Sequence, residues 1–140
     1  MFHTIVKASE NFCIHQIGLS YTVTDKITKM RTLIAYIDIQ NSEEKSFRVY
    51  VAAQEAFVQK ISKIFLEEDE SDEETLIDMI LETANLIIGS AKVIAEDENK
   101  NPYTIGTPHF QGISDFEIDC DKAITLEVQN DKMIIGIKEL

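Results

Sequence analysis

Between residues 76 and 89 the sequence is almost continuously apolar, but it is interrupted at regular intervals. The interruptions are Asp78, Glu82, Asn85 and Gly89, at positions i, i+4, i+7 and i+11. At about 100° per residue, these four positions lie within roughly 60° of one another around an α-helix. The spacing therefore predicts a helix that is buried on most sides and carries one narrow polar seam. We use "polar seam" below for these four residues.

Two interpretations of the polar seam fit its spacing. A surface helix needs one wet face, so the seam could simply face water. Alternatively, a carboxylate and an amide one turn apart could dock a partner and position a water molecule. Gly89 is compatible with either interpretation. It could allow a partner's backbone to come close, or it could relieve packing inside the protein, and a helix-interior glycine needs such a reason.

The length and composition are those of an ordinary globular protein. With 140 residues, 44% of them apolar and 27% charged, we expect one domain spanning residues 1–140. No apolar run approaches the roughly 18 residues that a membrane span needs. The first residues show no basic segment followed by a long apolar segment, so we expect no signal peptide and a cytoplasmic location.

The net charge of -12 limits the partners. A chain this acidic repels nucleic-acid phosphates instead of neutralising them, and it disfavours anionic membrane surfaces. Proteins or cations are the expected partners. An acidic run at residues 67–74 holds seven acids in eight positions, but it lacks the glycine and the spacing of a calcium loop. We interpret it as a solvated loop that leads into the next helix.

Hydrophobic periodicity predicts the elements in order. Residues 2–6 could begin a short helix or strand, and the loose alternation over residues 12–23 favours a strand with Gly18 as a bulge. Strands over 28–40 and 47–51 should pair as a hairpin, and a helix should follow over 53–66. Ser71 and Glu74 form a capping box, from which the seam helix should run to about residue 96. Later strands are expected near 103–112 and 113–119, followed by a closing hairpin of 123–128 and 133–137. The predicted fold class is α+β, with a mainly antiparallel sheet of about five or six strands and two long helices on one face.

Other kinds of chemistry have little support in the sequence. The three histidines, His3, His15 and His109, are scattered, and none has a second ligand at metal spacing. Cys13 and Cys120 are far apart, and we expect both to be buried thiols. No phosphate-binding loop, dinucleotide fingerprint or nucleophilic-serine motif is present. The polar seam therefore remains the candidate site. Its amide could hold a water in line with a phosphoryl group, and its carboxylate could pair with a partner's lysine.

The motif Asp-x-x-x-Glu-x-x-Asn-x-x-x-Gly, formed here by the polar seam, resembles the signature of the CheC/CheX/FliY phosphatases of bacterial chemotaxis. The flanking sequence extends the resemblance. Residues 48–57 are similar to the family's strand leading into the preceding helix. Residues 82–92, with small residues and a lysine after Gly89, resemble CheX in particular, and residues 106–112 are similar to the family's proline-containing strand. The resemblance covers roughly residues 45–115.

This resemblance implies a phosphatase for the phosphorylated response regulator CheY. Glu82 would form a salt bridge to a lysine of the receiver active site, and Asn85 would orient the water that attacks the aspartyl phosphate. Asp78 and Gly89 would support the motif. The resemblance implies no cofactor or metal bound by this chain, because the magnesium ion would belong to the receiver.

The number of motifs distinguishes members of this family. CheC and FliY carry two motifs in a pseudo-symmetric repeat. The helix over residues 54–66 here contains Glu55 and Gln59 but no Glu-x-x-Asn. One motif points to CheX, and the resemblance then implies a homodimer formed through the sheets. The alternatives are a non-catalytic adaptor that binds a receiver, related to flagellar switch proteins, and a structural dimer module whose seam only faces water.

Overall fold

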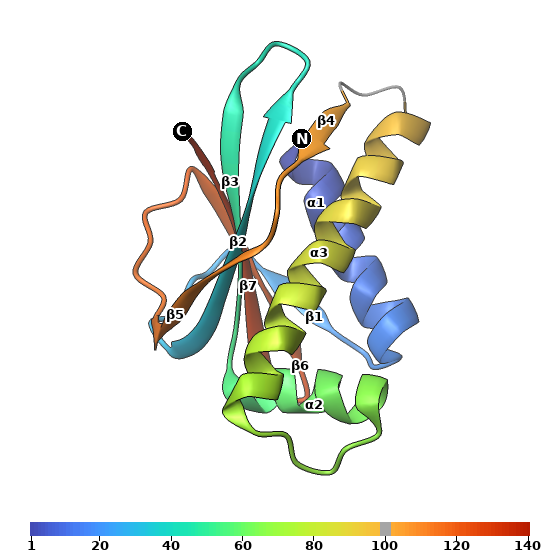
Figure 1. Cartoon of the computed structure of the whole chain (residues 1–140), viewed down its shortest axis with the longest axis vertical. Coiled ribbons are helices and arrows are strands. Elements are labelled where there is room, and N and C mark those ends of the chain that lie inside the picture. The colour runs from blue at the N-terminus through green and yellow to red at the C-terminus, as the bar shows by residue number, and fades with distance from the viewer. Residues whose placement is uncertain (99–101) are drawn as a thin grey trace.

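The computed structural model of the protein describes residues 1–98 and 102–140 (Figure 1). Helix α1 spans Phe2–Asn11 and continues directly into a π-helical segment, η1, at Phe12–Ile17. Helix α2 spans Glu55–Leu66, and helix α3, which carries the polar seam, spans Glu73–Asp97. Both predicted helices are therefore confirmed, and α1 with η1 is additional.

Within the described residues, seven strands form one sheet, in which every pairing is antiparallel. The strands are β1 Thr22–Thr24, β2 Arg31–Asn41, β3 Ser46–Ala53, β4 Tyr103–Ile105, β5 His109–Asp115, β6 Lys122–Val128 and β7 Asp131–Glu139. Their order is β1-β6-β7-β3-β2, with β4 and β5 both paired to β2. The α+β class and the antiparallel sheet are confirmed, with slightly more strands than the five or six predicted.

The two predicted hairpins are both present, and their local sequences explain them. In β2 and β3, alternating side chains point to opposite faces, and Ile37 pairs with Val49 in the register that keeps both buried. Strands β6 and β7 join through Gln129 and Asn130, which both have positive φ (50° and 71°). Positive φ at both central residues is the geometry of the two-residue turns that match strand twist.

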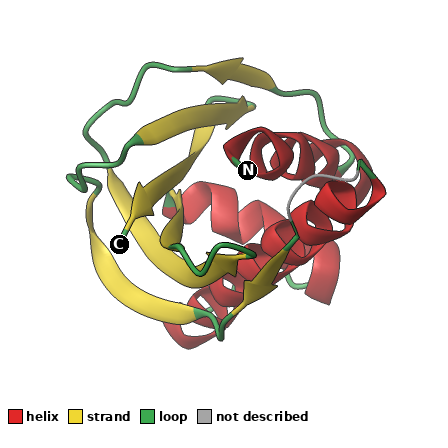
Figure 2. Cartoon of the chain, turned by 90° about the horizontal axis from the view of Figure 1, so that it is seen from above, coloured by secondary structure: helices red, strands yellow, loops and turns green. Residues whose placement is uncertain are grey.

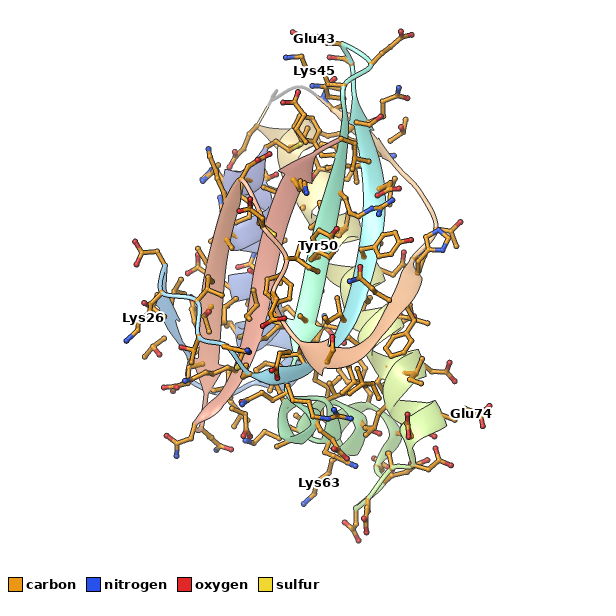
Figure 3. The ribbon with its side chains drawn as sticks, turned by 90° about the vertical axis from the view of Figure 1, so that its left-hand side faces the viewer. Lys26, Glu43, Lys45, Tyr50, Lys63 and Glu74 are labelled. Carbon is orange, nitrogen blue, oxygen red and sulfur yellow. The ribbon has the colours of Figure 1, made fainter. Side chains whose placement is uncertain are left out.

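The helices cover one face of the sheet (Figure 2). The main core lies between the sheet and the inner faces of α1, α2 and α3, and its fully buried side chains include Phe57, Ile61, Ile80, Ile87 and Leu126. The outer face of the sheet carries a smaller apolar cluster around the labelled Tyr50 (Figure 3). After β5 the chain crosses this outer face, where Phe116 contacts Tyr50 edge-on. The strand predicted over 113–119 is therefore displaced, because pairing with β2 ends at Asp115.

The strand predicted over residues 12–23 is wrong for most of its length. The segment continues α1 as helix through residue 17, and only Thr22–Thr24 is a strand. Ile5, Ala8 and Phe12 are buried at helical spacing, so burial of this face decides the structure. Gly18 is not a bulge. It ends the helix in the left-handed conformation, with φ 73°, which favours glycine.

The helix start predicted at Ser71 is displaced by one residue. Asp72 is the N-cap of α3, and its carboxylate accepts a hydrogen bond of 2.9 Å from the Thr75 backbone N–H. Ser71 is instead buried, and its hydroxyl contacts that of Ser62 and donates to Glu68. Ser71 cannot cap the helix because its side chain points into the α2–α3 contact.

Candidate functional site

Helix α3 places the polar seam on its outer face, as the sequence predicts. The side chains of Asp78, Glu82 and Asn85 are exposed, and Gly89 is half-buried. The opposite face of the helix is anchored in the core by side chains that are at most 9% exposed, namely Met79, Ile80, Ala84, Ile87 and Ile88. A helix held in this way fixes the separation of the groups that it presents.

The functional groups of the seam have no partner within the described part of the chain. No hydrogen bond or ion pair involves the side chain of Asp78, Glu82 or Asn85 there. The neighbouring Thr83 differs, because it is buried and its hydroxyl donates to the Met79 carbonyl at 2.7 Å. The seam's carboxylates and amide therefore remain available to groups outside the chain.

Gly89 has no packing reason within the described residues. A Cβ built on it would meet no atom within 4 Å, and its φ is not in the left-handed region. Relief of packing, one of the two explanations that the sequence allowed, is therefore excluded for the contacts that the structure describes. A helix-interior glycine costs about 1 kcal/mol relative to alanine, so the open space above it remains to be explained.

Glu82 and Asn85 are separated by one helical turn, or about 4.5 Å along the axis. A carboxylate can accept from a lysine or arginine, whereas an amide can accept through its oxygen and donate through its nitrogen. Neither group is a strong nucleophile. Together they can dock a cation and orient a water, but the reacting group must come from another molecule.

The exposed side of α3 changes character along its length. Its N-terminal half presents acids at Glu73, Glu74, Asp78 and Glu82, and Glu74 projects away from the helix (Figure 3). From Asn85 to Ala95 the helix contains no acid, and Lys92 is half-buried there. The seam thus joins an acidic N-terminal half to a stretch without carboxylates, which ends at the exposed acids Glu96 and Asp97.

A groove lies beside the C-terminal half of the seam, between η1 and α3. Its volume is about 290 Å³, and we call it the η1–α3 groove. The residues that line it are Ala8, Asn11, Phe12, His15, Gln16, Leu86 and Ser90. Sequence analysis missed this groove because it predicted a strand where η1 lies. The helical spacing of Ile5, Ala8 and Phe12 was the signal that could have revealed the helix on one side of the groove, but not its contact with α3.

Another cavity, of about 280 Å³, lies behind the first turn of α3. Its lining comes from the start of β2, from β5 and from the N-termini of α2 and α3, and it includes Arg31, Glu55, Glu73 and Leu76. None of the four seam residues lines this cavity, so it is separate from the candidate site.

The described residues offer neither a metal-binding cluster nor a reactive thiol. Across residues 1–98 and 102–140, no group of three or more His, Cys, Asp or Glu side chains is placed to hold a metal ion. Burial raises the pKa of Cys13 and of Cys120 to about 11, so both thiols stay protonated at neutral pH. In the described part of the chain, no helix combines the length and the apolarity that crossing a bilayer requires.

Comparison with known proteins identifies the family. The family model described as "Chemotaxis phosphatase CheX" matches residues 33–130, a wider range than the sequence motif alone covers. The chain belongs to this CheX family. No curated protein sequence matches it significantly.

Solved structures share the fold. A chemotactic CheC-like protein from Shewanella oneidensis MR-1 is 14% identical with a TM-score of 0.81, over 99% of this chain and 96% of that one. Chemotaxis protein CheX from Vibrio vulnificus is 18% identical with a TM-score of 0.77, over 98% and 97%. A chain of the CheX–CheY–BeF3–Mg²⁺ complex from Borrelia burgdorferi is 12% identical with a TM-score of 0.68, over 99% and 97%. At sequence identities of 14%, 18% and 12%, the structural similarity establishes the fold alone.

Proposed function

We propose that this protein accelerates hydrolysis of the aspartyl phosphate on a CheY-type receiver domain in chemotaxis signalling. The observation that carries the proposal is the position of Glu82 and Asn85, which are exposed and unpartnered among the described residues on a helix anchored in the core. Membership of the CheX family and the fold shared with a CheX–CheY complex support this choice of partner.

In this proposal Asn85 positions the attacking water. Its amide oxygen accepts a hydrogen bond from the water, while the water oxygen faces the phosphorus atom in line with the leaving carboxylate. Phosphoryl transfer needs little more than such positioning and stabilisation of charge. The magnesium ion is held by the receiver, where it neutralises charge on the phosphoryl oxygens.

Glu82 contributes by docking. An exposed carboxylate one turn before Asn85 can pair with a lysine of the receiver and fix the register in which the amide enters the receiver site. Asp78 lies one further turn away and adds negative charge on the same side. Gly89 leaves room for the receiver's backbone to cross the helix.

The test is phosphate release from phosphorylated receivers of the same organism. The parent protein should shorten the lifetime of one of them. Asn85→Ala should reduce the maximal rate at least about a hundredfold while keeping affinity, the size expected when a group that orients the reactants is lost. Glu82→Ala should mainly raise KM, and Glu96→Ala, at an exposed position five helical turns after Asp78, is the matched control.

An adaptor would give a different result. Binding to the receiver without faster phosphate release by the parent protein would contradict the phosphatase proposal and favour the adaptor. Equal maximal rates for Asn85→Ala and the parent would contradict the role given to Asn85.

We also propose a homodimer formed through the sheets, acting in the cytoplasm where its receiver partner would be. The outer face of the sheet supports this interface. The Arg48 guanidinium binds both oxygens of Asp38 at 2.8 and 3.0 Å and lies 4.1 Å from the centre of the Tyr36 ring. His109 stacks on the same ring at 5.2 Å. Tyrosine and arginine are enriched in protein interfaces, and a face that carries both charge signs can pair with its own copy.

A further inference from the structure

We propose that the η1–α3 groove is a second contact surface for the phosphorylated receiver, and that it holds an apolar side chain from the receiver surface beside the phosphorylated aspartate. This inference rests on the proposed function and deepens it. The polar seam performs the chemistry, and the groove determines which receivers bind tightly.

The groove is continuous with the polar seam. Leu86, on the wall of the groove, lies one turn after Glu82, and Ser90 directly follows Gly89. A partner that covers Asn85 and crosses α3 at Gly89 toward η1, where no side chain stands in its way, extends over the groove. The two surfaces therefore belong to one footprint.

The charge of the groove fits this partner. None of the residues that line it is an acid, in a chain with a net charge of -12. The half-buried Leu86 supplies apolar surface beside the buried Phe12, and the polar lining consists of neutral amide and hydroxyl groups together with His15. An aspartyl phosphate carries about two negative charges near neutral pH. Carboxylates with no cation to pair with are unfavourable beside this phosphate, because like charges repel across an interface. Glu82 is compensated by the receiver lysine in the proposed function, whereas the groove lining adds no further carboxylate.

The size of the groove favours a side chain over a free small molecule. Its volume of about 290 Å³ lies at the lower limit of ligand pockets, which usually measure about 300–1,000 Å³. An open groove with an apolar base instead resembles the pockets that receive anchor side chains at protein interfaces.

The π-helical turn gives η1 its shape at this point. The wider turn exposes His15 and Gln16 at the groove, while Phe12 and Ile17 remain buried. Segments of π-helix are rare and occur frequently at functional sites.

The decisive experiment fills the groove. Ser90→Trp places a large ring there, and Ser42→Trp, in the exposed β2–β3 turn, is the matched control. With the phosphorylated receiver, Ser90→Trp should raise KM about tenfold or more and leave kcat at saturation unchanged. Binding to the receiver loaded with beryllofluoride and Mg²⁺ should weaken by the same factor. Ser42→Trp should match the parent in both measurements.

A second pair of variants changes charge at nearly constant shape. Gln16→Glu adds a carboxylate to the groove, and Gln129→Glu adds one in the β6–β7 turn. Gln16→Glu should raise KM severalfold at low salt and less at high salt, because salt screens the repulsion. The control should not change KM.

The outcomes separate the two proposals. If the parent accelerates phosphate release and both Ser90→Trp and Gln16→Glu keep the parent's KM, the groove inference is overturned and the proposed function stands. If the parent accelerates release from none of the receivers, the proposed function itself fails. A fall in kcat at unchanged KM for folded Ser90→Trp would also overturn the inference, because the groove would then act on the chemical step.

Discussion

Gly89 is a glycine in the interior of α3, although neither its backbone conformation nor its packing requires one. Its φ is not left-handed, and apart from its chain neighbours and the adjacent backbone of its own helix, no described atom lies within 4 Å of the position of a Cβ. Helix-interior glycine loses more conformational entropy on folding than alanine does. A residue that weakens its helix and fills no structural need fits a surface that another molecule approaches closely.

Gly89→Ala therefore separates stability from function. The substitution should raise the free energy of unfolding by about 0.5–1 kcal/mol, because alanine favours the helix and meets no neighbour. The same methyl group should lower kcat/KM toward the phosphorylated receiver by crowding its backbone. Urea denaturation and phosphate-release kinetics on one preparation measure both effects. A loss of stability would show an internal packing role for the glycine, and unchanged kcat/KM would contradict the close approach of the receiver.

At the scale of elements, the start of α3 depends on Asp72. Its carboxylate caps the helix through hydrogen bonding with Thr75, which lowers the pKa of Asp72 below its ordinary value. Because the pKa of Asp72 is lower in the folded state than in the unfolded state, the cap stabilises the fold fully at pH values above the ordinary aspartate pKa. This stabilisation is lost as the pH falls through the lowered value.

Asp72→Ala should therefore reduce the urea midpoint at pH 7, and this difference from the parent should shrink as the pH approaches 3. Asp72→Asn should keep the cap, and its urea midpoint should change less with pH than the parent's, because the amide oxygen accepts the same hydrogen bond at every pH. Asp69→Ala, in the exposed loop before the helix, is the control. If Asp69→Ala lowered the urea midpoint equally, the stabilisation would come from the overall charge of the loop and not from the cap at Asp72.

Sequence analysis predicts the elements whose patterns are local. The long run of α3 with its polar seam, and the β2–β3 and β6–β7 hairpins, follow from periodicity and turn residues alone. Periodicity does not predict residues 12–17 correctly, because their apolar residues fit both periods. Only burial in the main core, where Phe12 contacts Phe65 of α2, selects the helix. Similarly, Ser71 and Asp72 are both good capping residues, and the contact between Ser71 and Ser62 decides between them.

The same division applies to the site. The exposure of Glu82 and Asn85 follows from spacing on one helix, so the sequence predicts it. The η1–α3 groove is formed by two segments about 75 residues apart in the chain. No periodicity within either segment reveals that they lie together.

At the scale of the whole molecule, the two faces differ. Helix α3, which carries the polar seam, lies on one side of the sheet, and the outer face with Tyr50 lies on the other (Figures 1 and 3). Tyr36 pairs with and contacts Tyr50, so the array of Tyr36, Arg48 and His109 belongs to this outer face. Because the faces are opposite, a dimer formed through the outer face would leave both polar seams accessible, one on each protomer.

Sedimentation measurements test this arrangement. The parent should sediment with twice the chain mass of 15.9 kDa, and low salt should weaken association because each chain carries a net charge of -12. His109→Glu, at an exposed position stacked on Tyr36, should shift the equilibrium toward monomer. Glu43→Gln, in the distant β2–β3 turn, is the control. A dimer unaffected by His109→Glu would place the interface elsewhere, and a monomeric parent would contradict the dimer.

The most direct measurement is the single-turnover rate constant for phosphate loss from the phosphorylated receiver, with the protein in saturating excess. The parent should raise this rate constant far above that of the receiver alone. Asn85→Ala should bind the receiver equally well and leave the rate constant close to the receiver's own value. If saturating Asn85→Ala released phosphate as fast as the parent, Asn85 would not position the water, and the mechanism would be contradicted.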